Sequence, residues 1–257
     1  MNGNGKLSGK AALVTGASRG IGKATAVRLA QDGASVAVNY RGNARGAEEL
    51  VRELKAQGAE AAAFQADVSD VAQTTRLVDL AADAFGGLDI LVSNAGVEHF
   101  APLAEITPED FDRIFAINTR GQLFAVQQAV RYMGDGGRIV LTSSVSATRS
   151  VFHHTLYAAS KAAVSSMVLN LAAELGQRGI TINAIAPGGT ATDMASTHAA
   201  SYKPPPLDVS METWVKLYVA LGRLARPEEI AAVTAFLVSD DASYITGRTI
   251  QADGGFY

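Results

Sequence analysis

Short apolar runs alternate along the chain with longer segments whose apolar residues recur every three or four positions. The short runs, typical of buried strands, are at residues 11–14, 35–38, 60–65, 88–93, 138–142, 180–185 and 249–252. The longer segments, typical of helices, are at residues 44–57, 71–85, 107–133, 157–176 and 227–238, and a further helix ends near residue 31. This alternation predicts an α/β fold, with a doubly wound parallel sheet of about seven strands and helices on both faces.

The pattern has no break, so we expect a single domain from residue 11 to residue 257. Residues 1–10 are polar and rich in Gly and Asn, which predicts a flexible segment without the apolar core of a signal peptide. Residues 190–221, with three prolines at 204–206, are the least regular part. We expect them to be a loop insertion on the substrate side; the alternative is a surface loop without a role.

The composition restricts the possible partners. Hydrophobic residues make up 48% of the chain and charged residues 18%, and the net charge is −3, so no nucleic-acid-binding surface is expected. The chain has no cysteine, which excludes a thiolate nucleophile and agrees with a reducing compartment. No window approaches the roughly 18 apolar residues of a membrane span. We expect a cytoplasmic protein that binds neither nucleic acid nor membrane.

The sequence GASRGIG at residues 16–22 follows the first predicted strand and opens the next helix. Glycines allow a tight turn and a close approach of the backbone to a pyrophosphate, and the helix N-terminus offers free N–H groups to the anion. The turn therefore predicts a dinucleotide site on a Rossmann-type fold. The alternative is a plain strand-to-helix turn.

Tyr157 and Lys161 are four residues apart in a predicted helix, so they are expected on one face, one turn apart. A free phenol has a pKa of about 10 and is a poor acid or base at neutral pH, but a nearby ammonium stabilises the phenolate. The pair could therefore transfer a proton to a carbonyl oxygen. Aromatic and Lys residues often share this spacing, so the alternative is a purely structural pair.

With four further motifs, these residues make the chain resemble the short-chain dehydrogenase/reductase family. The turn has that family's Gly-x-x-x-Gly-x-Gly spacing, and Tyr157 and Lys161 have its Tyr-x-x-x-Lys spacing. The other motifs are Asn94-Ala95-Gly96 after the fourth strand, Asn118 in the next helix, Ser144 upstream of the tyrosine, and Pro187-Gly188 after the sixth strand. The matches extend from Thr15 to Gly255.

The resemblance implies a role for each of four catalytic residues. Ser144 would hold the carbonyl oxygen and Tyr157 would donate the proton. Lys161 would also hold the nicotinamide ribose, and Asn118 would hold a water that links the lysine to solvent. We expect NADPH-dependent reduction of a ketone to a secondary alcohol.

The residues after the second predicted strand indicate which nicotinamide cofactor is used. A carboxylate there would bind the 2′-hydroxyl of NAD, but this chain has Asn39-Tyr40-Arg41, and Arg19 is in the turn. Arginine can hold a phosphate through two charge-assisted hydrogen bonds, so NADP(H) is predicted. The alternative is that both arginines are solvated surface charges.

The resemblance extends the cofactor site to the ends of several strands. Asp67-Val68 matches a pair that contacts adenine, although Asp67 could instead cap a helix. Thr192 matches a threonine at the nicotinamide end, although Gly189-Thr190-Ala191 departs from the usual apolar residue. The expected cofactor-binding residues are Gly16, Ser18, Arg19, Gly20, Ile21, Gly22, Asn39, Tyr40, Arg41, Asp67, Val68, Asn94, Ala95, Gly96, Tyr157, Lys161, Pro187, Gly188, Thr190 and Thr192.

Aromatic residues in the segments that would form the pocket favour a cyclic, aromatic or polyketide-type carbonyl. The candidate substrate residues are Ser146, His153, Tyr202 and Trp214. The Asn-Tyr pattern and the long loop also resemble polyhydroxynaphthalene and related polyketide ketoreductases. The alternatives are a 3-oxoacyl-thioester reductase, a sugar or steroid alcohol dehydrogenase, and a non-enzymatic NADP-sensing protein.

Two further expectations concern metals and assembly. The histidines at 99, 153 and 154 lack the spacing of a zinc site on one helix face, so no metal is expected. The resemblance implies a homotetramer, and the helices predicted at 121–133 and 157–176 are apolar on more than one face.

Overall fold

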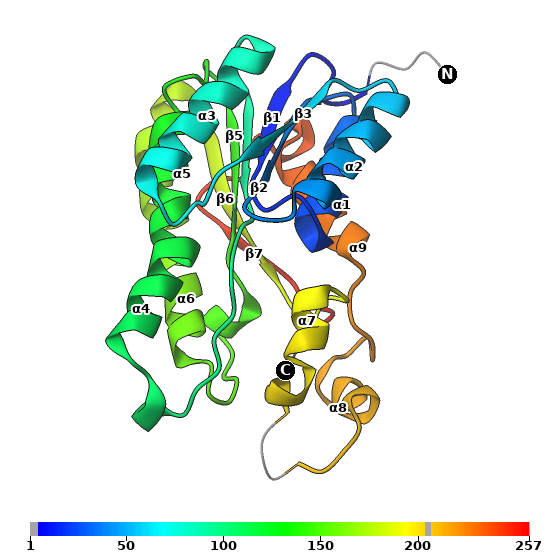
Figure 1. Ribbon diagram of the computed structural model, residues 1–257, viewed down its shortest axis with the longest axis vertical. Helices are drawn as coiled ribbons and strands as arrows, with labels where there is room; N and C mark the ends of the chain where they lie inside the picture. The colour runs from blue at the N-terminus through cyan, green and yellow to red at the C-terminus, as the bar shows by residue number, and fades with distance from the viewer. Residues whose placement is uncertain (1–4, 204–206, 257) are drawn as a thin grey trace.

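A seven-stranded sheet lies between two layers of helices in the computed structural model, which describes residues 5–203 and 207–256 (Figure 1). The strand order is β3-β2-β1-β4-β5-β6-β7, and every neighbouring pair is parallel. The strands are β1 (Ala11–Val14), β2 (Ser35–Tyr40), β3 (Ala61–Gln65), β4 (Ile90–Ser93), β5 (Arg138–Thr142), β6 (Thr181–Pro187) and β7 (Thr249–Ala252). The predicted doubly wound, Rossmann-type sheet is confirmed.

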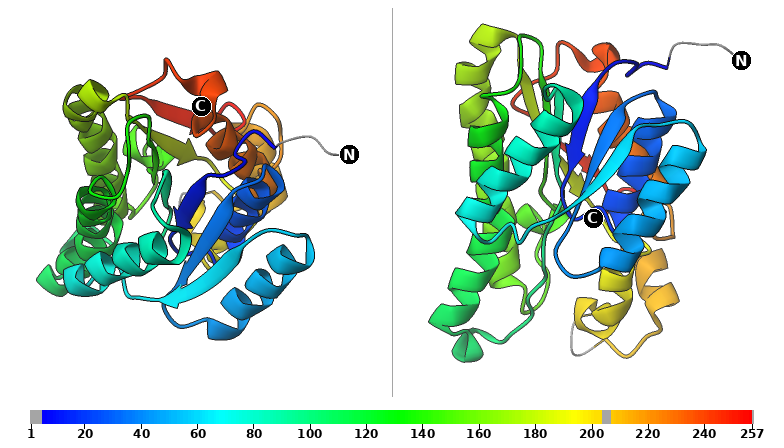
Figure 2. Two further views of the ribbon diagram at one scale, coloured as in Figure 1. Left: turned by 90° about the horizontal axis from the view of Figure 1, so that it is seen from above. Right: turned by 45° about the horizontal axis from the view of Figure 1, so that its top comes forward.

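Two sets of helices cover opposite faces of the sheet (Figure 2). The buried residues of α1, α2 and α9 share one apolar core with the sheet, and those of α3, α5 and α6 share the other. The helices are α1 (Gly20–Gln31), α2 (Ala44–Ala56), α3 (Val71–Phe85), α4 (Pro108–Phe115), α5 (Gly121–Ala129), α6 (Thr155–Leu175), α7 (Asp193–Thr197), α8 (Met211–Tyr218) and α9 (Pro227–Leu237). None of them, within the described chain, has the length and hydropathy that crossing a bilayer requires.

The helix predicted over residues 107–133 is divided into α4, a π-helical turn at Ala116–Arg120, and α5. Thr107 caps α4 as predicted, because its hydroxyl accepts a hydrogen bond from the Asp110 N–H at 3.1 Å and Pro108 occupies the first turn. Asp70, rather than Asp67, caps α3. A π-helical turn inserts an extra residue into a helix and is frequent at functional sites.

Residues 190–221, where the sequence predicts irregular chain, contain the short helices α7 and α8. Trp214, Val215 and Val219 form a small apolar core of their own, onto which Tyr202 and Phe256 pack. Figure 1 shows both helices at the bottom of the view, beyond the sheet. The three prolines at 204–206 lie outside the described residues.

Residues 5–10 are held against the sheet, although the sequence predicts flexibility. Leu7 is only 3% exposed, and its N–H donates to the Asp32 carbonyl oxygen at 2.7 Å. The N–H of Ser35, the first residue of β2, donates to the Lys10 carbonyl oxygen at 2.9 Å. Residues 1–4 lie outside the described residues.

The strand order places a switch point between β1 and β4. The chain passes from β1 to β2 on one side, and from β4 to β5 on the other. The carboxyl ends of two strands that diverge in this way form the crevice in which doubly wound sheets bind ligands. The predicted motifs lie at the carboxyl ends of the first six strands, β1 to β6, so the parallel topology gathers them at this end.

Candidate active site

The glycine turn after β1 and residues 94–96 after β4 meet closely at the switch point. The Thr15 hydroxyl accepts hydrogen bonds from the N–H groups of Asn94, at 2.9 Å, and Ala95, at 3.0 Å. Gly16 has φ of +63°, and a Cβ there would lie 2.9 Å from the Ala95 Cα. Glycine satisfies both restrictions at residue 16, so the close approach of the two segments depends on it.

No side chain of the described residues caps the N-terminus of α1. Its N-cap residue, Arg19, is extended and makes no capping hydrogen bond, whereas Asn43, Asp70 and Thr107 cap α2, α3 and α4. The first N–H groups of α1 are thus left without a capping acceptor at the positive end of the helix dipole. This terminus suits an anion such as a pyrophosphate.

The Asn39 side chain ties the glycine turn to the sheet. It is 1% exposed, and its oxygen accepts a hydrogen bond from the Gly16 N–H at 3.1 Å. Its amide nitrogen donates to the carbonyl oxygens of Phe64, at 3.2 Å, and Ala66, at 3.3 Å. The backbone therefore uses both ends of this amide, so the Asn39 side chain holds the turn in place.

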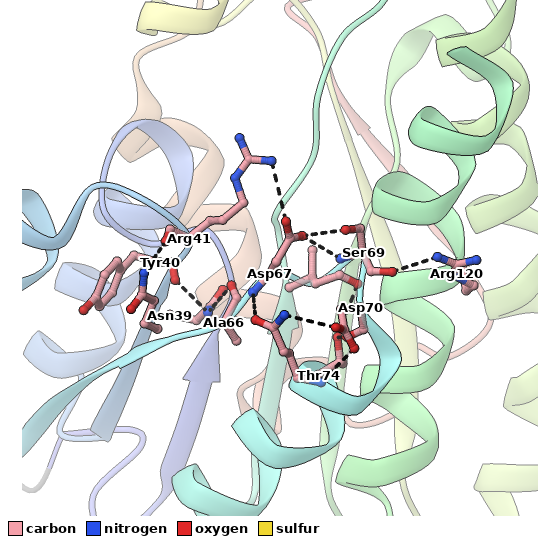
Figure 3. Close-up of polar contacts among 12 residues, drawn as sticks. Asn39, Tyr40, Arg41, Ala66, Asp67, Ser69, Asp70, Thr74 and Arg120 are labelled. Carbon is pink, nitrogen blue, oxygen red and sulfur yellow. Dashed lines mark hydrogen bonds and ion pairs between the residues drawn. The ribbon is translucent and has the colours of Figure 1, made fainter. Parts of the chain in front are cut away.

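Arg41 and Arg19, the two predicted phosphate ligands, are about two-thirds exposed. Arg41 Nη1 lies 3.8 Å from an Asp67 carboxylate oxygen, and Arg19 Nη1 lies 3.8 Å from an Asp193 oxygen. Figure 3 shows the Arg41 guanidinium directed toward Asp67, which also accepts hydrogen bonds from Ser69. Exposed ion pairs of this kind contribute little energy. Both guanidinium groups are therefore free to bind another anion.

Tyr157 and Lys161 lie together on α6, as their spacing predicts. Lys161 Nζ donates to the Thr142 carbonyl oxygen at 2.8 Å and lies 5.6 Å from the centroid of the Tyr157 ring. Burial lowers the pKa of Lys161 to about 8, and the Glu98 carboxylate opposes that shift. Burial and Glu98 raise the pKa of Tyr157, while the hydrogen bond with Ser144 lowers it. The phenol is thus protonated at neutral pH and holds the proton that an acid needs, although the net shift is opposite to the one that the sequence predicts from a nearby ammonium.

Three serines lie close together after β5, and their contacts distinguish them. The Ser143 hydroxyl donates to the Lys161 carbonyl oxygen at 2.9 Å and pairs with Ser165. The Ser144 oxygen accepts a hydrogen bond from the Ser146 N–H at 3.2 Å and interacts with Tyr157. Ser144 is therefore the serine of this group that contacts the tyrosine.

Asn118, in the π-helical turn, pairs with the backbone of Val97. Its side-chain oxygen accepts from the Val97 N–H and its nitrogen donates to the Val97 carbonyl oxygen, both at 2.9 Å. The nitrogen also donates to the Ser160 hydroxyl at 3.1 Å. A Cβ at Gly96 would lie 3.3 Å from both Asn118 Oδ1 and Lys161 Nζ. The structure thus brings Asn118 Oδ1 and Lys161 Nζ together on the Cβ side of one glycine.

The rings of Phe100, His154 and Tyr157 form a continuous stack. Phe100 stacks on His154 at 4.2 Å, and His154 stacks on Tyr157 at 4.4 Å. Tyr202 approaches Phe100 edge-on at 5.2 Å, with the planes 84° apart. These rings give the site a flat apolar wall.

The four candidate substrate residues differ in their surroundings. Tyr202 contacts this aromatic stack, and Ser146 contacts Ser144. Trp214 packs inside the small core of residues 190–221. His153 is exposed, with φ of +56°.

Sequence reasoning left Glu98 out of the candidate site residues. In the structure its carboxylate is hydrogen-bonded to the Tyr202 hydroxyl, and its charge raises the pKa of both Lys161 and Tyr157. One signal was available: Glu98 is the only carboxylate between Asp89 and Glu105.

Known proteins resemble this chain over almost its whole length. Residues 16–257 match the family model described as enoyl-(acyl carrier protein) reductase. The chain is 46% identical to the short chain dehydrogenase/reductase nsrJ of Aspergillus novofumigatus, over 98% of this chain and 97% of that one. It is 44% identical to the versicolorin reductase of Emericella nidulans, over 99% and 98%. A short chain dehydrogenase from Burkholderia cenocepacia, solved in complex with NADP, has a TM-score of 0.89 and 43% identity, over 97% and 98%.

Proposed function

The chain belongs to the short-chain dehydrogenase/reductase family of oxidoreductases, and we propose that it reduces a ketone to a secondary alcohol with NADPH. One arrangement carries the proposal. Lys161 Nζ lies 5.6 Å from the ring centroid of Tyr157, which interacts with Ser144 beside the crevice at the switch point. An acid, a cation and a hydroxyl donor at this place suit the protonation of a carbonyl oxygen.

The uncapped N-terminus of α1 and the exposed arginines fit the cofactor. The pyrophosphate would bind the turn at Gly16, Ser18, Gly20, Ile21 and Gly22, and Arg19 and Arg41 would bind the 2′-phosphate. The NADP complex of the Burkholderia relative supports this choice. Tyr40, Asp67, Val68, Asn94, Ala95, Gly96, Pro187, Gly188, Thr190 and Thr192 complete the proposed set. Bound NADPH would supply the hydride that reduces the carbonyl carbon.

The chain's own residues handle the proton. Ser144 donates a hydrogen bond to the substrate carbonyl oxygen. Tyr157 transfers its phenolic proton to that oxygen, so its O–H bond breaks as the alcohol O–H bond forms. The Lys161 ammonium stabilises the resulting phenolate, and Asn118 holds the water that connects Lys161 to solvent.

A cyclic or aromatic ketone fits the site best. The aromatic wall of Phe100 and Tyr202, with His154 buried between Phe100 and Tyr157, favours contact with a ring, by stacking or edge-on. A relative 44% identical is named a versicolorin reductase, which is in line with a polyketide-type substrate.

The test is reduction of a carbonyl panel with NADPH by the wild type and Tyr157→Phe. The panel contains 1-tetralone, acetoacetyl thioesters and, in the oxidative direction, sugars and steroid alcohols. Tyr157→Phe is expected to lower kcat by about 1000-fold, within the range of general acid catalysis, while NADPH still binds. Tyr244→Phe, at a fully exposed tyrosine, is the control. Full activity of Tyr157→Phe would refute the mechanism, and NADPH binding without turnover of any substrate would favour the sensing alternative.

A homotetramer is proposed for the assembly. Phe111 on α4, Leu123 on α5 and Leu169 on α6 are 47%, 37% and 61% exposed, and these helices belong to the same layer. Exposed apolar side chains on neighbouring helices support a covered surface. A stable monomer in light scattering at low concentration would contradict the tetramer. The cytoplasmic location stays a prediction, which cell fractionation would test.

A further inference from the structure

Glu98 is a partly buried carboxylate beside the catalytic pair, and the proposed reaction does not use it. It follows Gly96 by two residues, and a Cβ at Gly96 would lie 3.3 Å from Lys161 Nζ. Its charge raises the pKa of both Lys161 and Tyr157. Its Oε1 accepts a hydrogen bond from the hydroxyl of Tyr202, whose ring lies 6.1 Å from that of His154, and His154 stacks on Tyr157. The carboxylate therefore belongs to the cluster of side chains around the reacting phenol.

Two contacts from distant segments hold Glu98 in place. The preceding residue, Val97, is paired at both its N–H and its carbonyl oxygen with Asn118, at 2.9 Å each. On the other side, the Tyr202 hydroxyl donates to Glu98 Oε1 from a segment 104 residues later in the chain. Tyr202 is itself packed edge-on against Phe100. The orientation of the carboxylate is thus fixed before a substrate arrives.

The second carboxylate oxygen, Oε2, is buried and has no hydrogen-bond partner among the described residues. A buried acceptor without a donor is costly, and more so when it is charged. Burial raises the pKa of Glu98, while Tyr202, His198 and Lys161 act in the opposite direction. The site therefore offers a fixed acceptor that needs a donor, next to a flat aromatic wall.

We propose that Glu98 is a specificity-determining residue, whose Oε2 accepts a hydrogen bond from a hydroxyl group on the ring of the ketone substrate. This inference rests on the proposed function and narrows it to ring ketones with a second oxygen, a hydroxyl, near the reacting carbonyl. A site built to bind a substrate hydroxyl discriminates strongly against the analogue without it, because the buried acceptor then stays unpaired.

The test compares kcat/KM for 1-tetralone and for each of its monohydroxy derivatives, with NADPH as reductant. The wild type is expected to prefer at least one hydroxytetralone by about tenfold or more. In Glu98→Leu that preference falls to about twofold or less, because the acceptor is lost for both substrates alike. The ratio cancels any effect of the substitution on Lys161 that both substrates share.

Two further variants separate recognition from folding. Glu98→Gln keeps the shape of the side chain and one acceptor oxygen. It is therefore expected to fold and to retain part of the preference for the hydroxytetralone, and it remains usable if Glu98→Leu is unstable. Glu105→Leu, at an exposed carboxylate, should keep the wild-type ratio. An unchanged ratio in both Glu98 variants would overturn the proposal and leave Glu98 as an anchor for Tyr202.

A binding measurement distinguishes failure of this inference from failure of the proposed function. Calorimetry with NADP-saturated protein compares 1-naphthol and naphthalene, neither of which has a ketone to reduce. Glu98→Leu is expected to weaken 1-naphthol binding about tenfold and to leave the two probes equal. Equal affinity of wild type and variant for 1-naphthol would overturn the inference, even if ketones are reduced. If no ketone is reduced but 1-naphthol binding still depends on Glu98, only the proposed reaction is refuted.

Discussion

His154 stacks its ring on that of Tyr157, with the centroids 4.4 Å apart and the planes 10° from parallel. Phe100 covers the opposite face of the imidazole at 4.2 Å. Burial, and to a smaller extent the nearby His198 and His99, lowers the pKa of His154 to about 3. The imidazole is therefore neutral at physiological pH, and Tyr157 has an uncharged aromatic neighbour on this side.

This burial makes His154 a source of acid sensitivity. In the unfolded chain its pKa is about 6.5, so as the pH falls from 6.5 toward 3 the unfolded state takes up a proton that the folded state does not. At pH 5 the loss of stability from this residue is about 2 kcal/mol. His154→Phe keeps the stack and removes the titration, so it should raise Tm more at pH 5 than at pH 7.5. His153→Phe, at the exposed neighbour, is the control, and an equal Tm change at both pH values would contradict the prediction.

Arg41 is expected to select NADPH over NADH. Its guanidinium is exposed and only loosely paired with Asp67, so it can turn to a 2′-phosphate. Arg41→Ala should raise the KM for NADPH by about tenfold or more and change the KM for NADH little, because NADH lacks the phosphate. Steady-state kinetics with both cofactors measures this. Arg45→Ala, at another exposed arginine nearby, should leave both values unchanged. A wild-type preference for NADH would refute the assignment.

The pH profile of reduction should report Lys161. Its pKa is about 8 because the ammonium is buried, and the charged form is the one that stabilises the Tyr157 phenolate. We expect kcat/KM to fall above pH 8, by about tenfold per pH unit. The Glu98 carboxylate raises the pKa of Lys161, so Glu98→Gln should move this alkaline limb to lower pH. A limb that stays in place, or moves to higher pH, would show that another group titrates.

Gly16→Ala should abolish NADPH binding. The new Cβ would lie 2.9 Å from the Ala95 Cα, so the turn and the end of β4 would have to separate. Gly58→Ala is a matched control, since Gly58 also has positive φ, +89°, but has no neighbour within 4 Å. Both substitutions should lower stability by about 1 kcal/mol or more through backbone strain. Titration followed by NADPH fluorescence should show binding by Gly58→Ala and none by Gly16→Ala. Tight binding by Gly16→Ala would argue against the turn as the cofactor site.

The sequence predicted those parts of the site that local spacing determines. Tyr157 and Lys161 are one helical turn apart, and the glycine turn joins one strand to one helix, so each motif is contained in a few residues. The Glu98–Tyr202 hydrogen bond joins residues 104 positions apart, and no local pattern indicates it. The stack of Phe100 on His154 likewise depends on two separate loops meeting.

The strands and long helices were predictable because each follows from the periodicity of a short stretch of sequence. The structure differs from the prediction at residues 5–10 and 190–221, where tertiary packing stabilises the chain. The helices α7 and α8 are five and eight residues long, too short to be stable alone. They form because Trp214 and its neighbours bury a small core, which the irregular sequence pattern does not reveal. Leu7 is a single apolar residue in a polar segment, so its anchoring has no periodic signal either.

The buried amide of Asn39 limits how this protein could be re-engineered toward the cheaper cofactor, NADH. An Asp at this position would lose the N–H groups that bind the carbonyl oxygens of Phe64 and Ala66, and would place a negative charge against those oxygens. The substitution Asn39→Asp would therefore destabilise the contacts between the glycine turn and the sheet, whatever its effect on the choice between NADH and NADPH. Libraries should keep residue 39 constant and vary Arg41, whose side chain faces water.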